Sequence, residues 1–113
     1  MVSGMSDIYF QLSSNEEQYQ EFSVGLDIFR FVFNYNSYNN RYYLTIYKNF
    51  DLVLKSIKLV ITQNNLFSPY EYKDIGSFSV LLEDYILDED KKIYNEITKT
   101  NITNAIFRWQ YGN

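Results

Sequence analysis

The side chains most capable of chemistry in this sequence are carboxylates gathered in one short segment. They are Glu83, Asp84, Asp88, Glu89 and Asp90. Carboxylate oxygens bind calcium, and paired carboxylates can perform acid–base catalysis. The spacing lacks the Asp-x-Asp-x-Asp-Gly order of a calcium loop, and nothing in the sequence places two carboxylates across a cleft. We therefore interpret residues 83–92 as a solvated loop.

The residue types that most often carry catalysis or bind metals are missing. The chain of 113 residues contains no histidine and no cysteine. The usual general base near neutral pH, the thiol nucleophile, the thiolate zinc site and the disulfide are all excluded. The four glycines form no phosphate-binding loop. We expect no enzyme, and hence no catalytic residue, no cofactor and no bound metal.

The charge balance argues against nucleic acids and membranes as partners. The net charge is −4 and the isoelectric point is about 4.7. An acidic domain is repelled by phosphate backbones and by anionic lipid. No apolar run approaches the 18 or so residues of a transmembrane helix, and the first residues do not resemble a signal peptide. We expect residues 1–5 to be a flexible extension and residues 6–113 to form one domain.

Aromatic side chains dominate residues 29–50 and raise a question about stacking. A row of rings on one strand face could stack on single-stranded nucleic acid. Alternate positions of a strand, however, more often face a core, so Phe29, Phe31 and Phe33 are predicted to be buried with Leu44 and Ile46. The tyrosines around the asparagine-rich turn are expected to be half-exposed, which suits contacts with another protein. These candidate interface residues are Tyr35, Tyr38, Tyr42, Tyr43 and Tyr47.

The spacing of apolar residues predicts an all-β fold. Alternation with a period of two residues recurs along most of the chain and predicts about seven antiparallel strands in a small sandwich or partly closed barrel. The predicted strands cover approximately residues 7–12, 20–26, 28–35, 42–47, 52–61, 77–84 and 105–111. The alternation changes phase at Lys55-Ser56, which predicts a β-bulge or a sharp bend there. Residues 91–99 fit either a short helix or a loop.

The order of these segments resembles a known family. The chain reads IFRFVFNYNSYNNRYYLTIYKNFDLVLKSIKLVITQNNLFSPYEYKDIGSFSVLLED and later IFRWQY. This succession of strands, turns and an apolar Pro-Tyr segment is similar to the small baseplate plug family of contractile-tailed bacteriophages over residues 22–85. The chain departs from the family pattern in having Tyr35 and Tyr42 where tryptophan is common and Ser56 where glycine is common.

The resemblance implies a structural virion protein that is made in the host cytoplasm and has no catalytic activity. Such a protein lies in the central baseplate, where it joins or closes the tail tube near the hub and spike. The implied partners are hub, tail-tube, spike or tape-measure proteins, in a symmetric threefold or sixfold assembly of this chain. The residues alone leave another interpretation open: an autonomous β-barrel module that binds single-stranded nucleic acid or carbohydrate.

Overall fold

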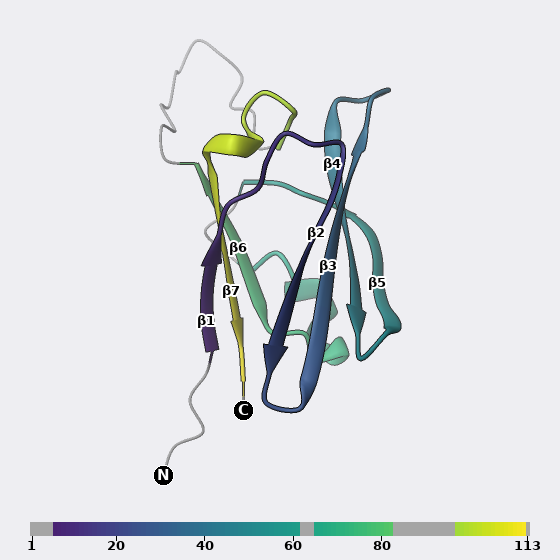
Figure 1. Cartoon of the computed structure of the whole chain (residues 1–113), viewed down its shortest axis with the longest axis vertical. Helices are drawn as coiled ribbons and strands as arrows, with labels where there is room; N and C mark the ends of the chain where they lie inside the picture. Colours follow the sequence, from purple (N-terminus) through teal and green to yellow (C-terminus); the bar gives the residue numbers. More distant parts are fainter. Residues whose placement is uncertain (1–5, 62–64, 83–96, 113) are drawn as a thin grey trace.

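The protein is built from two antiparallel β-sheets, seen in a computed structural model (Figure 1) that describes residues 6–61, 65–82 and 97–112. The strands are β1 (Ser6–Phe10), β2 (Glu17–Val24), β3 (Asp27–Asn36), β4 (Arg41–Lys48), β5 (Asp51–Lys58), β6 (Ser77–Leu82) and β7 (Ala105–Tyr111). One sheet has the order β2-β3-β4-β5 and the other has the order β1-β7-β6. Two short 3₁₀ helices, η1 (Ser68–Lys73) and η2 (Ile102–Asn104), precede β6 and β7. The predicted all-β class and the number of strands are confirmed, with the sheets arranged as a sandwich.

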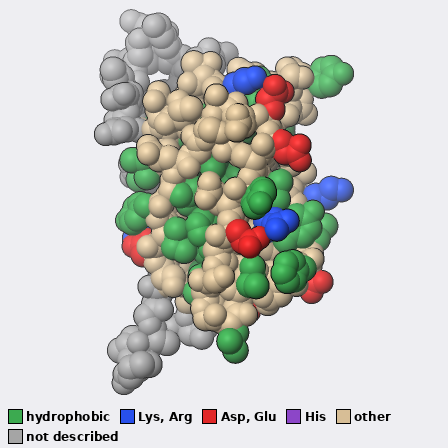
Figure 2. All heavy atoms as spheres, in the orientation of Figure 1, with side chains coloured by type: hydrophobic (Ala, Val, Ile, Leu, Met, Phe, Trp, Pro, Cys, Tyr) green, Lys and Arg blue, Asp and Glu red, His purple; other side chains and the backbone are tan. Residues whose placement is uncertain are grey.

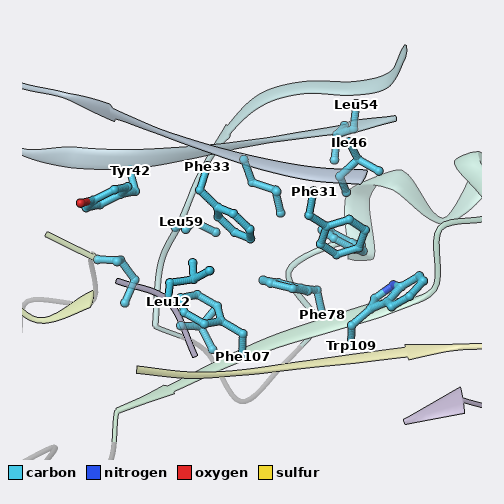
Figure 3. Close-up of a cluster of buried hydrophobic side chains, with 14 of the residues drawn as sticks. Leu12, Phe31, Phe33, Tyr42, Ile46, Leu54, Leu59, Phe78, Phe107 and Trp109 are labelled. Atoms are coloured by element: carbon cyan, nitrogen blue, oxygen red, sulfur yellow. The ribbon is translucent and has the colours of Figure 1, made fainter. Parts of the chain in front are cut away.

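The core lies between the sheets and is mostly aromatic. Phe31 on β3 has no exposed surface and lies 5.0 Å from Trp109 on β7, measured between ring centroids. The rings of Phe33 and Phe107 make a second contact of this kind at 5.9 Å. Figure 3 shows these side chains filling the space between the sheets. The alternation seen in the sequence therefore separates core from surface, and the predicted burial of Phe29, Phe31, Phe33, Leu44 and Ile46 is confirmed.

The predicted bulge in β5 is present at Lys55-Ser56. Leu44 pairs with Ile57 and Ile46 pairs with Leu54, so two residues of β5 face one residue of β4. Ser56 has a φ of 53°, and its backbone N–H donates to the side-chain hydroxyl of Thr45 at 3.0 Å. An extra residue of this kind switches the strand face that points inward. The bulge thereby allows Leu54 and Leu59 both to be buried, although they lie five positions apart.

Two boundaries differ from the sequence-based expectation. β5 ends at Lys58 rather than near residue 61. The N–H of Leu59 still donates to the carbonyl of Tyr42 on β4 at 3.0 Å, but the carbonyl of Leu59 accepts from the N–H of Ile97 at 3.2 Å. The helix considered for residues 91–99 is not formed in the part that is described, where residues 97 and 98 are irregular and a turn follows. Residues 91–96 and residues 1–5 lie outside the described part of the chain.

Candidate subunit interface

The structure gives no support to a chemical site among the residues it describes. Within residues 6–61, 65–82 and 97–112, no three acidic side chains lie close enough together to hold a metal ion. The acidic segment, residues 83–90, lies outside the described part of the chain. Among the described residues, no helix has the length and apolar character needed to cross a membrane.

The row of phenylalanines on β3 is closed to ligands. Phe29, Phe31 and Phe33 have no exposed surface, because the rings of β7 cover them. A base or sugar could stack on them only if the two sheets separated. The stacking platform considered from the sequence is therefore part of the core.

The turn between β3 and β4 presents tyrosines that are held in place by hydrogen bonds. The Tyr35 hydroxyl donates to Asn40 Oδ1 at 2.6 Å, and Asn39 Nδ2 donates to the Tyr43 hydroxyl at 2.6 Å. Between them, Tyr38 is almost fully exposed at 99%. Together with neighbouring asparagines, Tyr35, Tyr38 and Tyr43 line a depression of about 480 Å³. We call this surface, made of Tyr35, Tyr38, Asn39 and Tyr43, the tyrosine turn.

Lys99, in the turn before η2, also holds the tyrosine turn in place. The backbone N–H of Lys99 donates to Asn40 Oδ1 at 3.4 Å, and the Lys99 ammonium lies 5.5 Å from the centre of the Tyr35 ring. The same ammonium pairs with Glu16 at 3.2 Å. The position of Tyr35 is restricted by the Lys99 ammonium above its ring and by Asn40 Oδ1, which accepts from both residues. The turn is thus presented in a defined conformation, which lowers the entropy cost of binding a partner.

Tyr42 does not belong to this surface, so the expectation that it is half-exposed is wrong. Its side chain has no exposed surface and lies in the core beside Tyr35, 5.1 Å away between ring centroids. The hydroxyl donates to the carbonyls of Ser14 and Asn15, each at 3.1 Å. Tyr42 shares its strand face with Leu44 and Ile46, and the connection between β1 and β2 supplies the carbonyls that a buried tyrosine needs.

Tyr47 is also separate from the tyrosine turn. It lies near the other end of β4, where it lines a different depression with Val32 and Phe50. The five tyrosines that the sequence grouped together therefore occupy three environments: the turn, the core and the outer face of the four-stranded sheet.

Removing the Tyr42 hydroxyl is expected to destabilise the fold modestly. Tyr42→Phe loses a hydrogen bond that is worth about 1 kcal/mol of unfolding free energy. Burial is the main cause that raises the pKa of the Tyr42 phenol, and the electrostatic effects of Tyr35 and Glu16 raise it further. The folded state therefore holds this proton more tightly, and the resulting stability is present below about pH 10 and is lost as the pH rises further.

Urea unfolding at pH 7 and above pH 10 measures both effects. Tyr42→Phe should be less stable than wild type at pH 7 and should lose less stability in alkali. Tyr38→Phe is the matched control, since its hydroxyl is exposed. Equal stability of the two variants at pH 7 would contradict the role of the Tyr42 hydrogen bond.

Several exposed apolar residues were not identified from the sequence. Leu26 is fully exposed, Phe50 is 76% exposed and Leu52 is 54% exposed. A phenylalanine directly after the turn-forming Asn49 was the available signal, because the second position of a two-residue hairpin loop usually takes glycine.

Comparison with protein families bears on what these surfaces serve. The family model described as "Cyanophage baseplate Pam3 plug gp18" matches residues 5–111. The chain belongs to this baseplate plug family. The match covers both sheets, from β1 to the end of β7. No curated protein matches the chain closely enough to add to this assignment.

Membership of the baseplate plug family defines the general role of the chain. A baseplate plug is a structural part of a phage tail, so the chain is a tail protein whose contacts are with other tail and baseplate proteins. The resemblance found in the sequence is thereby confirmed. Among the described residues, the large apolar side chains exposed at the surface are Tyr9, Tyr19, Leu26, Tyr38, Phe50 and Leu52.

Proposed function

We propose that this baseplate plug is an adaptor in the central baseplate that joins or closes the tail tube near the hub and spike. The observation that carries the proposal is the tyrosine turn, with Tyr38 exposed at its tip and Tyr35 and Tyr43 fixed by hydrogen bonds. Tyrosine is favoured at protein interfaces because it combines a large apolar ring with a polar hydroxyl and few rotatable bonds.

Strand edges offer a second kind of contact beside the tyrosine turn. β5 pairs with β4 on one side and, among the described strands, has no neighbour on the other. A partner strand added to such an edge gains backbone hydrogen bonds. The bulge at Ser56 interrupts this edge, which restricts the length over which a partner can pair. We propose that the edge of β5 and the tyrosine turn contact neighbouring tail proteins, in a baseplate where this chain is present in threefold or sixfold copies.

Binding to individual tail proteins tests the proposal. The wild-type chain is mixed with the purified hub, tail-tube, spike and tape-measure proteins encoded in the same genome, and binding is measured by biolayer interferometry. Tyr38→Ser is expected to weaken binding to at least one of them by about tenfold or more, the scale of an interface hot spot. Native mass spectrometry of that complex gives the copy number.

A matched control separates the loss of Tyr38 from the effect of replacing any exposed tyrosine with serine. Tyr9→Ser alters a tyrosine that is 58% exposed on the other sheet, and it should leave the same interaction unchanged. Both variants should melt near the wild-type temperature, because neither ring contributes to the core. Equal binding by Tyr38→Ser and wild type to every tail protein would remove the tyrosine turn from the interface.

A further inference from the structure

The turn between β4 and β5 holds a phenylalanine in a conformation that phenylalanine disfavours. Lys48 pairs with Asp51, so the loop contains only Asn49 and Phe50, with φ values of 51° and 72°. Two positive φ values are typical of a type I′ turn, in which glycine is favoured at the second position. The ring of Phe50 is nevertheless 76% exposed. The exposed Phe50 side chain therefore adds little packing energy that could offset the strain of its backbone. Backbone strain without such an offset is found at functional positions.

Hydrogen bonds from Asn49 fix the turn against the start of β3. The backbone N–H of Ile28 donates to Asn49 Oδ1 at 2.9 Å, and the N–H of Asn49 donates to the Ile28 carbonyl at 2.7 Å. Asn49 Nδ2 also donates to Asp27 Oδ1 at 3.0 Å. Because three bonds hold one small turn, the direction of the Phe50 ring is set before any partner binds, which reduces the entropy cost of docking.

Two other exposed apolar side chains lie at the same end of the four-stranded sheet as this ring. Leu52 follows it on β5, and Leu26 lies in the adjacent β2–β3 turn, directly before Asp27, which contacts Asn49. Phe50 also lines a depression of about 320 Å³ together with Ile28, Val32 and Tyr47 on the outer face of the sheet. Figure 2 shows hydrophobic side chains in the lower half of the molecule, interspersed with charged ones. We call Leu26, Phe50 and Leu52 the Phe50 patch.

The charged side chains around the patch favour a basic partner. Those that adjoin the two turns or line the depressions beside Phe50 and Leu52 are Glu21, Asp27, Asp51 and Asp74 on the acidic side, and Arg30, Lys48 and Lys55 on the basic side. Arg30 is paired with Glu21 at 2.9 Å, and Lys48 lies 3.7 Å from Asp74 and donates to the Tyr111 hydroxyl at 3.1 Å. Carboxylates therefore remain in excess, so a partner with positive charge around an apolar pocket complements this end.

The patch lies at the opposite end of the four-stranded sheet from the tyrosine turn. β3 runs from Asp27, beside the patch, to Asn36, beside Tyr38. Ten residues at the rise of a β-strand span about 30 Å. A protein bound at one end therefore leaves the other end free for a second protein.

We infer that the Phe50 patch docks into an apolar pocket, rimmed by lysine or arginine side chains, on a tail protein other than the one that binds the tyrosine turn. Phe50 is the anchor, and Leu26 and Leu52 exclude water around it. This inference rests on the proposed function, since it takes the partner to be a tail protein.

Phe50→Gly tests the inference because stability and binding should change in opposite directions. Glycine relieves the strain of the type I′ turn, so the melting temperature should rise. Loss of the ring should weaken binding to one purified tail protein of the same phage by about tenfold or more. Tyr38→Ser should leave that interaction unchanged, and raising the salt concentration should weaken it. A purely structural role for Phe50 would instead lower stability without this loss of binding.

Leu26→Ser provides a second variant that leaves the β4–β5 turn intact, and it should weaken the same interaction. If Phe50→Gly and Leu26→Ser both bind every tail protein as wild type does, the inference is overturned and the proposed function stands. If no tail protein binds the wild-type chain, the proposed function itself is overturned. If the variants lose only self-association in analytical ultracentrifugation, the patch contacts a second copy of this chain, and the inference of a different tail protein is overturned.

Discussion

Trp109→Ala is expected to lower the free energy of unfolding by about 3–5 kcal/mol, the cost typical of removing a fully buried aromatic side chain. Trp109 has no exposed surface and lies on the central strand of the three-stranded sheet. The rings of Phe29 and Phe31 lie 4.8 and 5.0 Å from it, so its loss leaves a cavity at the junction of the two sheets. Because small domains are stable by only about 5–15 kcal/mol, this one substitution should remove a large share of the total stability.

The indole nitrogen makes a separable contribution to this effect. Trp109 Nε1 donates to the carbonyl of Ile75 at 2.8 Å, in a fully buried position. Trp109→Phe retains most of the ring and leaves this carbonyl without its donor, a loss of about 1–3 kcal/mol. Urea unfolding followed by circular dichroism should place Trp109→Phe between wild type and Trp109→Ala. An alanine variant as stable as the phenylalanine variant would show that the ring does not join the two sheets.

Gly76→Ala is expected to destabilise the protein by about 3 kcal/mol or more, because two penalties coincide at one residue. Gly76 has a φ of +82°, which non-glycine residues rarely adopt. A Cβ at this position would clash with the backbone carbonyl of Gln110. Since the obstacle is backbone on the paired strand β7, β6 could accommodate a methyl group only by shifting away from its neighbour.

Gly25→Ala is the matched control for this prediction. Gly25 has a similar φ of +63°, but no atom lies within 4 Å of the position that a Cβ would occupy. Its cost should be limited to the backbone strain, about 1–2 kcal/mol. Thermal unfolding of the two variants therefore isolates the steric effect at Gly76. Equal losses of stability would indicate that β6 and β7 are not packed as closely as the structure shows.

The sequence was most informative where local periodicity decides the outcome. Alternation along β3 correctly separated Phe31 and Phe33 from the surface, and the change of phase at Ser56 correctly located the bulge. Both features depend on residues that are neighbours in the chain. The same rule would have assigned Tyr42 to the core, since it shares a face with Leu44. The interface prediction for Tyr42 instead followed the amphipathic chemistry of tyrosine. Its hydrogen-bond acceptors, the carbonyls of Ser14 and Asn15, lie 28 and 27 residues away in the chain, so the local sequence did not reveal them.

The candidate surfaces were harder to predict because they depend on how turns are arranged in space. The asparagines of residues 36–40 indicated a turn, and Tyr38 does lie exposed within it. Nothing in the local pattern showed that Leu26 and Phe50, which belong to different hairpins, lie at the same end of the sheet. The hydrogen bond between Asp27 and Asn49 brings these turns together, and it joins residues 22 positions apart.

The order of the strands also has a consequence for the kinetics of folding. Hairpins between consecutive strands build the sheet that contains β2 to β5, so its contacts are local in the chain and can form early. The other sheet needs β7, since β1 and β6 have no other partner among the described strands. The ion pair between Asp7 and Arg108 joins residues 101 positions apart. During synthesis, β7 therefore cannot cover the apolar face that carries Phe31 until this last strand has emerged from the ribosome. The nascent chain is most prone to aggregate in this interval.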